Sequence, residues 1–99
     1  MAKIELDFTG KFKALDGENM FYYDESGVKK DLENINIYFS NLLVNLKTDQ
    51  PMQNILLAQR IYTEGKIEVT AEESIFIKKR AEELEVSDIL KGQILKAFK

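Results

Sequence analysis

The chain has 99 residues, of which 14 are basic and 17 acidic, so its formal net charge is −3. It contains no cysteine and no histidine, which excludes disulfides, thiolate metal sites, cysteine nucleophiles and the commonest general base. Hydrophobic residues make up 44% and charged residues 31%, so the composition is that of one small globular domain spanning residues 1–99.

The first third of the chain predicts short strands and turns. Apolar and acidic residues alternate from Lys3 to Thr9, which is the period of a half-buried strand. A second apolar run lies at 12–15 and ends at an Asp-Gly turn signal. Residues 20–23 and 28–32 predict the two strands of a hairpin.

The middle of the chain predicts two helices. Apolar residues spaced by three and four indicate a helix over 37–46. A second is expected near 50–64, where Asp49 can act as N-cap, Pro51 suits the first turn and Gly65 ends the helix. This second helix follows the spacing of Met52, Ile55, Leu56, Gln59 and Tyr62.

The last third predicts a short extended link at 66–69 and two more helices. Thr70 and Glu73 form a capping box that opens a helix near 71–84, and the final helix is expected near 88–98. We therefore predict an α+β fold: N-terminal antiparallel hairpins or a meander, with 1–33 mainly β, packed on three to four helices within 34–99.

Residues 71–98 also resemble a DNA-binding helix-turn-helix. The positions that match the motif are Ala81, Leu84, Val86, Ser87 and Ile94. Glu85 stands where the turn usually has glycine, and Lys91 where a buried aliphatic residue is usual. The residues offered to DNA would be Ser87, Lys91, Gln93 and Lys96. The acidic balance of the chain argues against a nucleic-acid partner, so DNA-binding regulation is the alternative function.

Enzyme and cofactor motifs are not found in the sequence. The five glycines stand singly, at 10, 17, 27, 65 and 92, so no phosphate-binding loop is present. An alignment of Gly65 with the central glycine of a calcium loop puts Arg60, Tyr62 and Ala71 at ligand positions. None of the three can supply a charged oxygen ligand, so a calcium loop is excluded. The serines lack an activating histidine. We expect no catalytic, metal or cofactor site.

The order of segments resembles short proteins of unknown function encoded by phages and prophages. The segments that carry the resemblance are 12–17, 42–46, 58–62, 65–70 and 89–98. The resemblance implies a small cytoplasmic accessory protein and supplies no catalytic residues. The first residues contain acids and no apolar stretch, and the longest mostly apolar stretch is 35–46, so neither a signal peptide nor a membrane span is expected.

The strongest candidate for a functional surface is the run of four bulky residues Met20, Phe21, Tyr22 and Tyr23. In a strand, alternate members of this run point to opposite faces. Either the rest of the chain covers both faces, or one pair is exposed and contacts a protein partner or a second copy. The sequence therefore predicts a non-enzymatic protein-interaction module.

Overall fold

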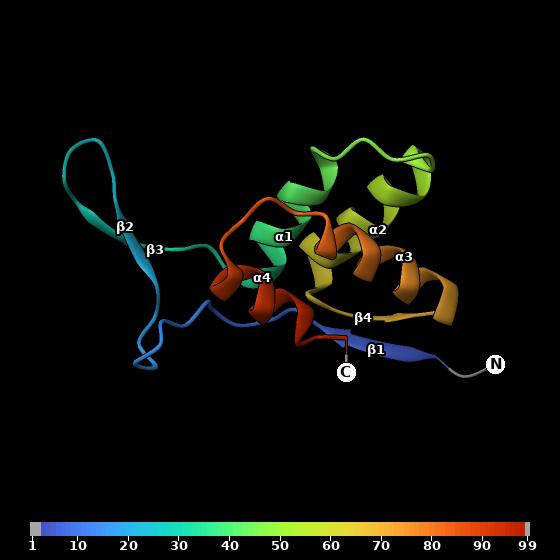
Figure 1. The fold of residues 1–99 in the computed structure, drawn as a ribbon, viewed down its shortest axis with the longest axis horizontal. Coiled ribbons are helices and arrows are strands. Elements are labelled where there is room, and N and C mark those ends of the chain that lie inside the picture. Colours follow the sequence, from blue (N-terminus) through green and yellow to red (C-terminus); the bar gives the residue numbers. More distant parts are fainter. Residues whose placement is uncertain (1–2, 99) are drawn as a thin grey trace.

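The chain alternates short strands with four helices in a computed structural model that describes residues 3–98. The strands are β1 (Ile4–Asp7), β2 (Phe21–Tyr23), β3 (Lys29–Asp31) and β4 (Lys66–Val69). The helices are α1 (Ile35–Val44), α2 (Pro51–Glu64), α3 (Ala71–Glu82) and α4 (Asp88–Leu95). The predicted α+β class is confirmed, and Figure 1 shows the helices gathered into one body.

The strands form two separate two-stranded antiparallel sheets within the described residues. β1 pairs with β4, with Ile4 opposite Val69 and Asp7 opposite Lys66, whereas β2 pairs with β3. The sequence predicted 66–69 only as an extended link and placed the partner of the first strand in an N-terminal hairpin or meander. In the structure that partner is β4. The run at 12–15 is not a strand, and it contributes only an isolated bridge from Lys13 to Asn19. Most of residues 1–33 lies outside strands.

One hydrophobic core joins the small β1–β4 sheet to all four helices. Its largest fully buried side chains are Phe8, Phe12, Phe39, Leu6, Leu43, Ile61, Ile77, Ile94 and Val69. The ring of Phe8 lies 5.1 Å from that of Phe39 on α1 and 5.7 Å from that of Phe98 after α4. The core therefore connects the first residues of the chain with the last ones.

The ends of the helices agree with the sequence in part. Thr70 and Glu73 form the predicted capping box, with bonds of 3.1 Å and 2.9 Å between side chain and backbone. Gly65 ends α2 at a φ of +71°, which glycine adopts without steric cost. The prediction for Asp49 was wrong: Gln50 is the N-cap residue, and none of the described side chains caps α2.

The face of α2 that packs into the core is the opposite of the one suggested by its apolar spacing. The buried residues of α2 are Asn54, Leu57, Ala58 and Ile61. The side-chain amide of Asn54 donates to the backbone oxygen of Leu43, 2.8 Å away, which links α2 to α1 in the interior. Met52, Leu56 and Tyr62 are exposed instead.

Candidate interaction surface

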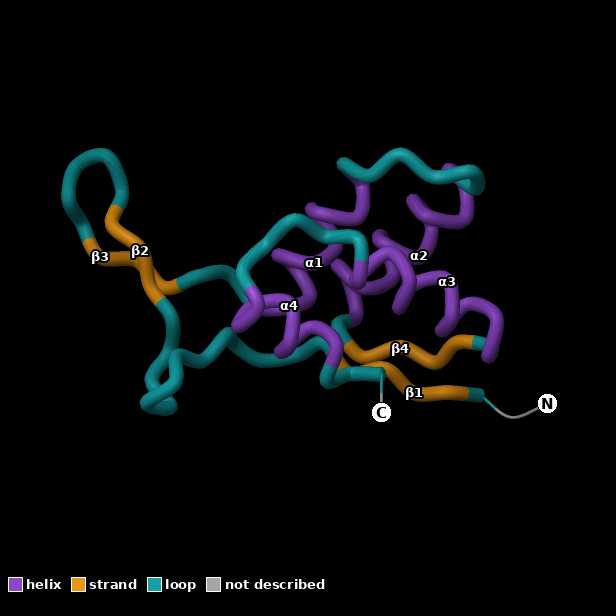
Figure 2. The backbone as a smooth tube through the Cα atoms, in the orientation of Figure 1, coloured by secondary structure: helices purple, strands orange, loops and turns teal. Residues whose placement is uncertain are grey.

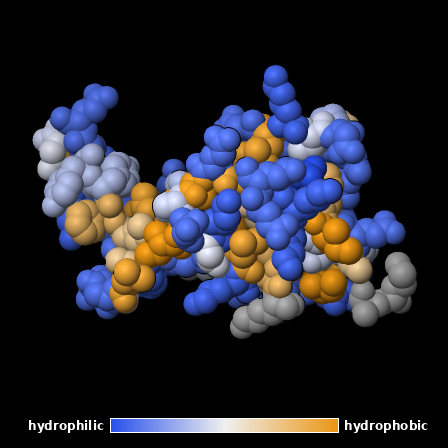
Figure 3. Space-filling model, in the orientation of Figure 1, coloured by the Kyte–Doolittle hydropathy of each residue, from blue (hydrophilic) through white to orange (hydrophobic). Residues whose placement is uncertain are grey.

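The predicted aromatic run forms an arm that extends away from the helical body. β2 and β3 pair with Phe21 opposite Asp31 and Tyr23 opposite Lys29. Figures 1 and 2 show this hairpin at the end of the molecule remote from β1 and β4, and the space-filling view in Figure 3 shows it standing clear of the body. The molecule is accordingly elongated, with extents of 47 × 26 × 23 Å. We call residues 20–32 the arm.

The tip of the arm is ordered by Asp24. One carboxylate oxygen of Asp24 accepts hydrogen bonds from the backbone N–H groups of Ser26 and Val28, each 2.9 Å long. Gly27 supplies the positive φ of +81° that the turn needs, and its N–H donates to the Asp24 carbonyl. Lys30 lies 3.5 Å from the second Asp24 oxygen. The turn therefore holds the two strands in one register.

The two faces of the arm carry different side chains. Phe21 and Tyr23 share one face and meet edge to face at 5.6 Å, with the Lys29 ammonium 4.3 Å from the centre of the Phe21 ring. Tyr22 pairs across the sheet with Lys30. Because side chains alternate along a strand, this pair occupies the other face. Phe21, Tyr22 and Tyr23 retain 47%, 46% and 65% of their exposure.

The root of the arm is anchored to the core. Met20 and Leu32 are half-buried against core residues, and the Leu32 N–H donates to the Met20 carbonyl. The Met20 N–H in turn donates to the carbonyl of the buried Phe12. The four predicted site residues therefore divide: Met20 holds the arm in place, and the three aromatic residues are presented to solvent.

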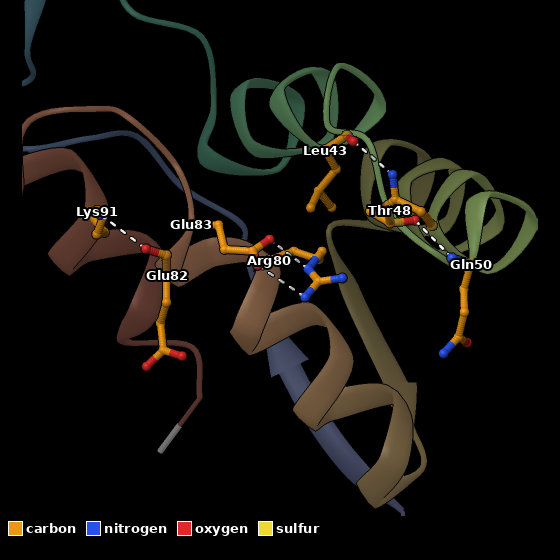
Figure 4. A network of polar contacts seen from close by, with 8 residues as sticks. Leu43, Thr48, Gln50, Arg80, Glu82, Glu83 and Lys91 are labelled. Carbon is orange, nitrogen blue, oxygen red and sulfur yellow. Dashed lines mark hydrogen bonds and ion pairs between the residues drawn. The ribbon is translucent and has the colours of Figure 1, made fainter.

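The residues of the alternative DNA-binding site lie in α4 or at its ends, and two of them are bonded to the backbone of other segments. Ser87 is the N-cap residue of α4, and its side chain makes no capping hydrogen bond to the described part of the chain. The Lys91 ammonium donates to the carbonyl of Glu82, as Figure 4 shows. The Gln93 amide binds both backbone groups of Lys13. Only Lys96 has the exposed, cationic character expected of a phosphate contact, and it borders a hollow that Glu5 and Asp7 also line.

Acidic side chains were the other candidates for chemistry. Within residues 3–98 no three of them are grouped as metal ligands. Hydrogen bonds from the Thr9 hydroxyl, at 2.5 Å, and from the Thr9 N–H, at 2.9 Å, hold the pKa of Asp7 below its ordinary value. Arg80 is buried and pairs with Glu83 twice: its Nε lies 2.9 Å from Glu83 Oε1, and its Nη2 donates a 3.2 Å hydrogen bond to Glu83 Oε2 (Figure 4). Arg80 also stacks over Phe76.

One exposed feature was missed by reasoning from the sequence, namely the outward face of α2. Its apolar spacing was visible, but it predicted the helix and not the surface. The signal that could have identified it is that α2 carries two apolar stripes, of which a small domain can bury only one.

Comparison of the chain with known protein families, with curated proteins and with solved structures finds no match. None of the described helices is long and apolar enough to cross a membrane. Function therefore has to be inferred from the geometry of this chain.

Proposed function

We propose that this is a non-enzymatic interaction protein that binds a protein partner through the exposed aromatic residues of its arm. The observation that carries the proposal is the exposure of Phe21, Tyr22 and Tyr23, three consecutive aromatic residues on a strand that stands clear of the body. Aromatic side chains are enriched at protein interfaces, where they bury a large area at a small cost in conformational entropy.

The arm also has the stiffness that favours binding. The Asp24 turn and the anchored root fix the hairpin before a partner arrives, so little additional ordering is needed on association. Each strand of the arm pairs on one side only among the described residues, so its outer edge can accept a strand from the partner. Lysines and acids beside the aromatic residues, such as Lys29 and Asp31, provide a polar rim.

The resemblance to short phage and prophage proteins extends the proposal to an accessory role in a bacterial cell that carries the phage. In that setting the partner would be a phage protein or a host protein in the cytoplasm. The chain would act by occupying or joining surfaces and not by chemistry, because no set of catalytic residues is recognised in its sequence.

The test is photo-crosslinking from the arm. A benzophenone amino acid replaces Tyr23, and the protein is irradiated in lysate of the source organism. The matched control carries the same group at Ile75, which is 67% exposed on α3 and comparable with Tyr23 at 65%. We expect a discrete protein adduct from position 23 that position 75 does not give.

The captured protein is then purified and titrated with the wild type, Tyr23→Ser and Ile75→Ser. The expected result is a loss of affinity of about tenfold or more in Tyr23→Ser alone, as is typical of an aromatic hot spot. Its melting temperature should be nearly that of the wild type because the side chain is exposed. Equal adducts from both positions, an adduct sensitive to nuclease, or no loss of affinity in Tyr23→Ser would contradict the proposal.

A further inference from the structure

Strand β1 lies at the margin of the molecule and pairs on one side only (Figure 1). The Phe8 N–H donates to the Gly65 carbonyl, and the register of β1 with β4 continues this pattern back to Leu6. The N–H and C=O groups of Glu5 and Asp7 therefore point away from β4, and within residues 3–98 no other segment is bonded to them. We call this side of β1 the free edge.

Comparable backbone groups near the free edge are occupied by side chains. On the outer side of β4, Arg60 Nη2 donates a 2.6 Å hydrogen bond to the carbonyl of Glu68. Further along the segment that follows β1, the Gln93 amide bonds to both backbone groups of Lys13. The free edge of β1 is therefore the place at which this small sheet can be extended by a strand from outside.

A hollow of about 820 Å³ lies beside the free edge. Glu5 and Asp7 line it from the β1 side, and Leu15, Ile89 and Ala97 are among the apolar residues of its other walls. A strand added to β1 would thus find apolar contacts as well as unpaired hydrogen-bonding groups. This combination is the one by which a sheet edge recognises an extended peptide: the backbone supplies affinity, and the side chains supply specificity.

The exposed face of the β1–β4 sheet is acidic. Across the two strands Glu5 stands opposite Glu68, and Asp7 opposite Lys66, so three acids share the face with one lysine. Lys66 lies 3.7 Å from Glu5. An added strand places every second side chain next to Glu5 and Asp7, and opposite charges across strands are stabilising. The face therefore favours a partner with basic residues at those two positions.

A second copy of β1 is a poor occupant for the same reason. Two copies can join their free edges antiparallel in two registers that overlap most of the strand. One register sets Glu5 opposite Glu5 of the second copy, and the other sets Glu5 opposite Asp7 of the second copy. Like charges directly opposite each other are destabilising, so the acids of β1 discriminate against pairing with itself.

We propose that the free edge of β1 binds an extended protein segment in antiparallel β pairing, with a basic residue opposite each of Glu5 and Asp7 and an apolar residue between them. The central side chain points to the same side as Leu6, which is fully buried, and so enters the apolar part of the hollow. This site lies at the opposite end of the molecule from the arm, so it does not depend on the function proposed for the arm.

Two lysines elsewhere in the hollow restrict the segment further. Lys13 and Lys96 both line it. The Lys13 ammonium is bonded to the side chain of Asn19, whereas Lys96 is exposed at the end of α4. A basic residue at the central position would bring a further positive charge into the hollow that these lysines line. An alternation of basic, apolar and basic residues therefore fits better than an uninterrupted basic run.

The first experiment titrates isotope-labelled protein with the blocked peptide TKVKT and follows the amide resonances by NMR. The amide protons of Glu5 and Asp7 should move downfield because they gain an acceptor, whereas that of Leu6, already bonded to β4, should move little. TEVET, which reverses both charges, should leave all three in place. So short a peptide should dissociate at about 1 mM. No downfield shift of Glu5 and Asp7 at about 5 mM TKVKT, or equal shifts with TEVET, overturns the proposal.

The second experiment separates β pairing from attraction between charges. In the antiparallel arrangement the lysine N–H groups of TKVKT donate to β1, and the valine N–H points away. N-methylation of the two lysines should therefore abolish binding, whereas N-methylation of the valine should preserve most of it. Both peptides keep the same charges. Equal behaviour of the two methylated peptides, or the reverse order, overturns the antiparallel pairing.

The third experiment places the site on the chain. Glu5→Lys and Glu68→Lys change the net charge equally, at exposed positions opposite each other on one face. Only Glu5 borders the free edge, so TKVKT should bind about tenfold more weakly to Glu5→Lys and at most about threefold more weakly to Glu68→Lys, one strand further away. Both variants should keep the wild-type circular dichroism spectrum. Equal losses, or unchanged binding to Glu5→Lys, overturn the proposal.

Discussion

The side-chain amide of Gln93 on α4 pairs with both backbone groups of Lys13, eighty residues away in the sequence. The Lys13 N–H donates to Gln93 Oε1 at 2.8 Å, and Gln93 Nε2 donates to the Lys13 carbonyl at 2.7 Å. The amide thus takes the place of a β partner for the segment that leads into the arm. Lys13 has no strand neighbour beyond its isolated bridge to Asn19 in the described structure.

Replacement of Gln93 by leucine should destabilise the fold through this tether. The substitution leaves a backbone donor and acceptor of Lys13 without their partners, and we expect a loss of about 2 kcal/mol in the free energy of unfolding. Urea titration measures it. Gln93→Glu keeps the acceptor and loses the donor, so it should fall between the wild type and Gln93→Leu above neutral pH. Wild-type stability in Gln93→Leu would mean that the pairing contributes nothing.

Duplex DNA binding should be weak because Gln93 is already bonded to the backbone of Lys13. The amide that a recognition helix would offer to bases is already bonded, and Lys91 is bonded to the Glu82 carbonyl. With a net charge of −3, we expect no change in the anisotropy of a labelled duplex at low micromolar protein and physiological salt. Submicromolar binding that Lys91→Glu abolishes would instead favour the alternative function.

Gly65→Ala should be more costly than a usual glycine substitution. The backbone of Gly65 has a φ of +71°, and a Cβ atom there would lie 2.9 Å from Thr9 Cγ2. We expect a loss of about 2 kcal/mol or more, from the left-handed backbone together with the clash. Thermal unfolding of Gly65→Ala and of Gly65→Ala/Thr9→Ser separates the two causes, because the serine removes the clashing methyl group. No recovery in the double variant would show that the clash is relieved in another way.

Thr70→Ala should lower stability by about 1 kcal/mol, since the N3 amide of α3 loses its acceptor. Thr70→Ser keeps the hydroxyl oxygen and is the matched control. Denaturant unfolding should place the serine variant close to the wild type. A loss of equal size in both variants would point to the methyl group, not the capping bond, as the source.

The contribution of Asp7 to stability should depend on pH in one direction. The Thr9 hydrogen bonds lower the pKa of Asp7 in the folded chain, so the unfolded chain takes up the proton first as pH falls. The stabilisation is therefore complete above the unfolded value near 4 and is lost as pH falls through the lower folded value. Asp7 is exposed, so we expect well under about 1 kcal/mol.

Asp7→Asn tests this dependence by comparison with the wild type in urea titrations at several pH values. The stability difference between the two proteins should be constant near neutral pH and shrink below pH about 4. Glu85→Gln, in the exposed turn before α4, serves as the control for general loss of charge. A difference that grows towards acidic pH would contradict the assignment.

Local signals were readable in the sequence, and long-range partners were not. The Thr70–Glu73 capping box and the alternation of residues 4–8 depend on neighbours in the chain, and both appear as predicted. The pairing of β1 with β4 could not be predicted, because two short alternating segments do not reveal that they are partners. The same holds for Asn54 and Gln93, since their amides bind backbone carbonyls, which have no sequence signature.

Which side chains of the arm and of α2 are exposed could not be decided from the sequence alone, for a physical reason. Apolar periodicity identifies a helix, but it does not say which of two stripes the core will bury. On α2 the core buries Asn54, whose amide bonds to Leu43 of α1, together with Leu57, Ala58 and Ile61, whereas Met52 and Leu56 stay outside. For Phe21 to Tyr23 the sequence is compatible with burial or exposure, and the structure shows all three side chains exposed.

The pairing of β1 with β4 has a consequence for folding during synthesis. Ile4 meets Val69, so the first strand leaves the ribosome some 65 residues before its partner has been synthesised. Until then Leu6 and Phe8, which are both fully buried in the folded protein, are exposed to solvent on an unpaired segment. Such distant pairing slows folding relative to the local helices, so α1 and α2 are expected to dock first. β1 therefore stays without its partner for longer than β2, whose partner β3 follows within a few residues.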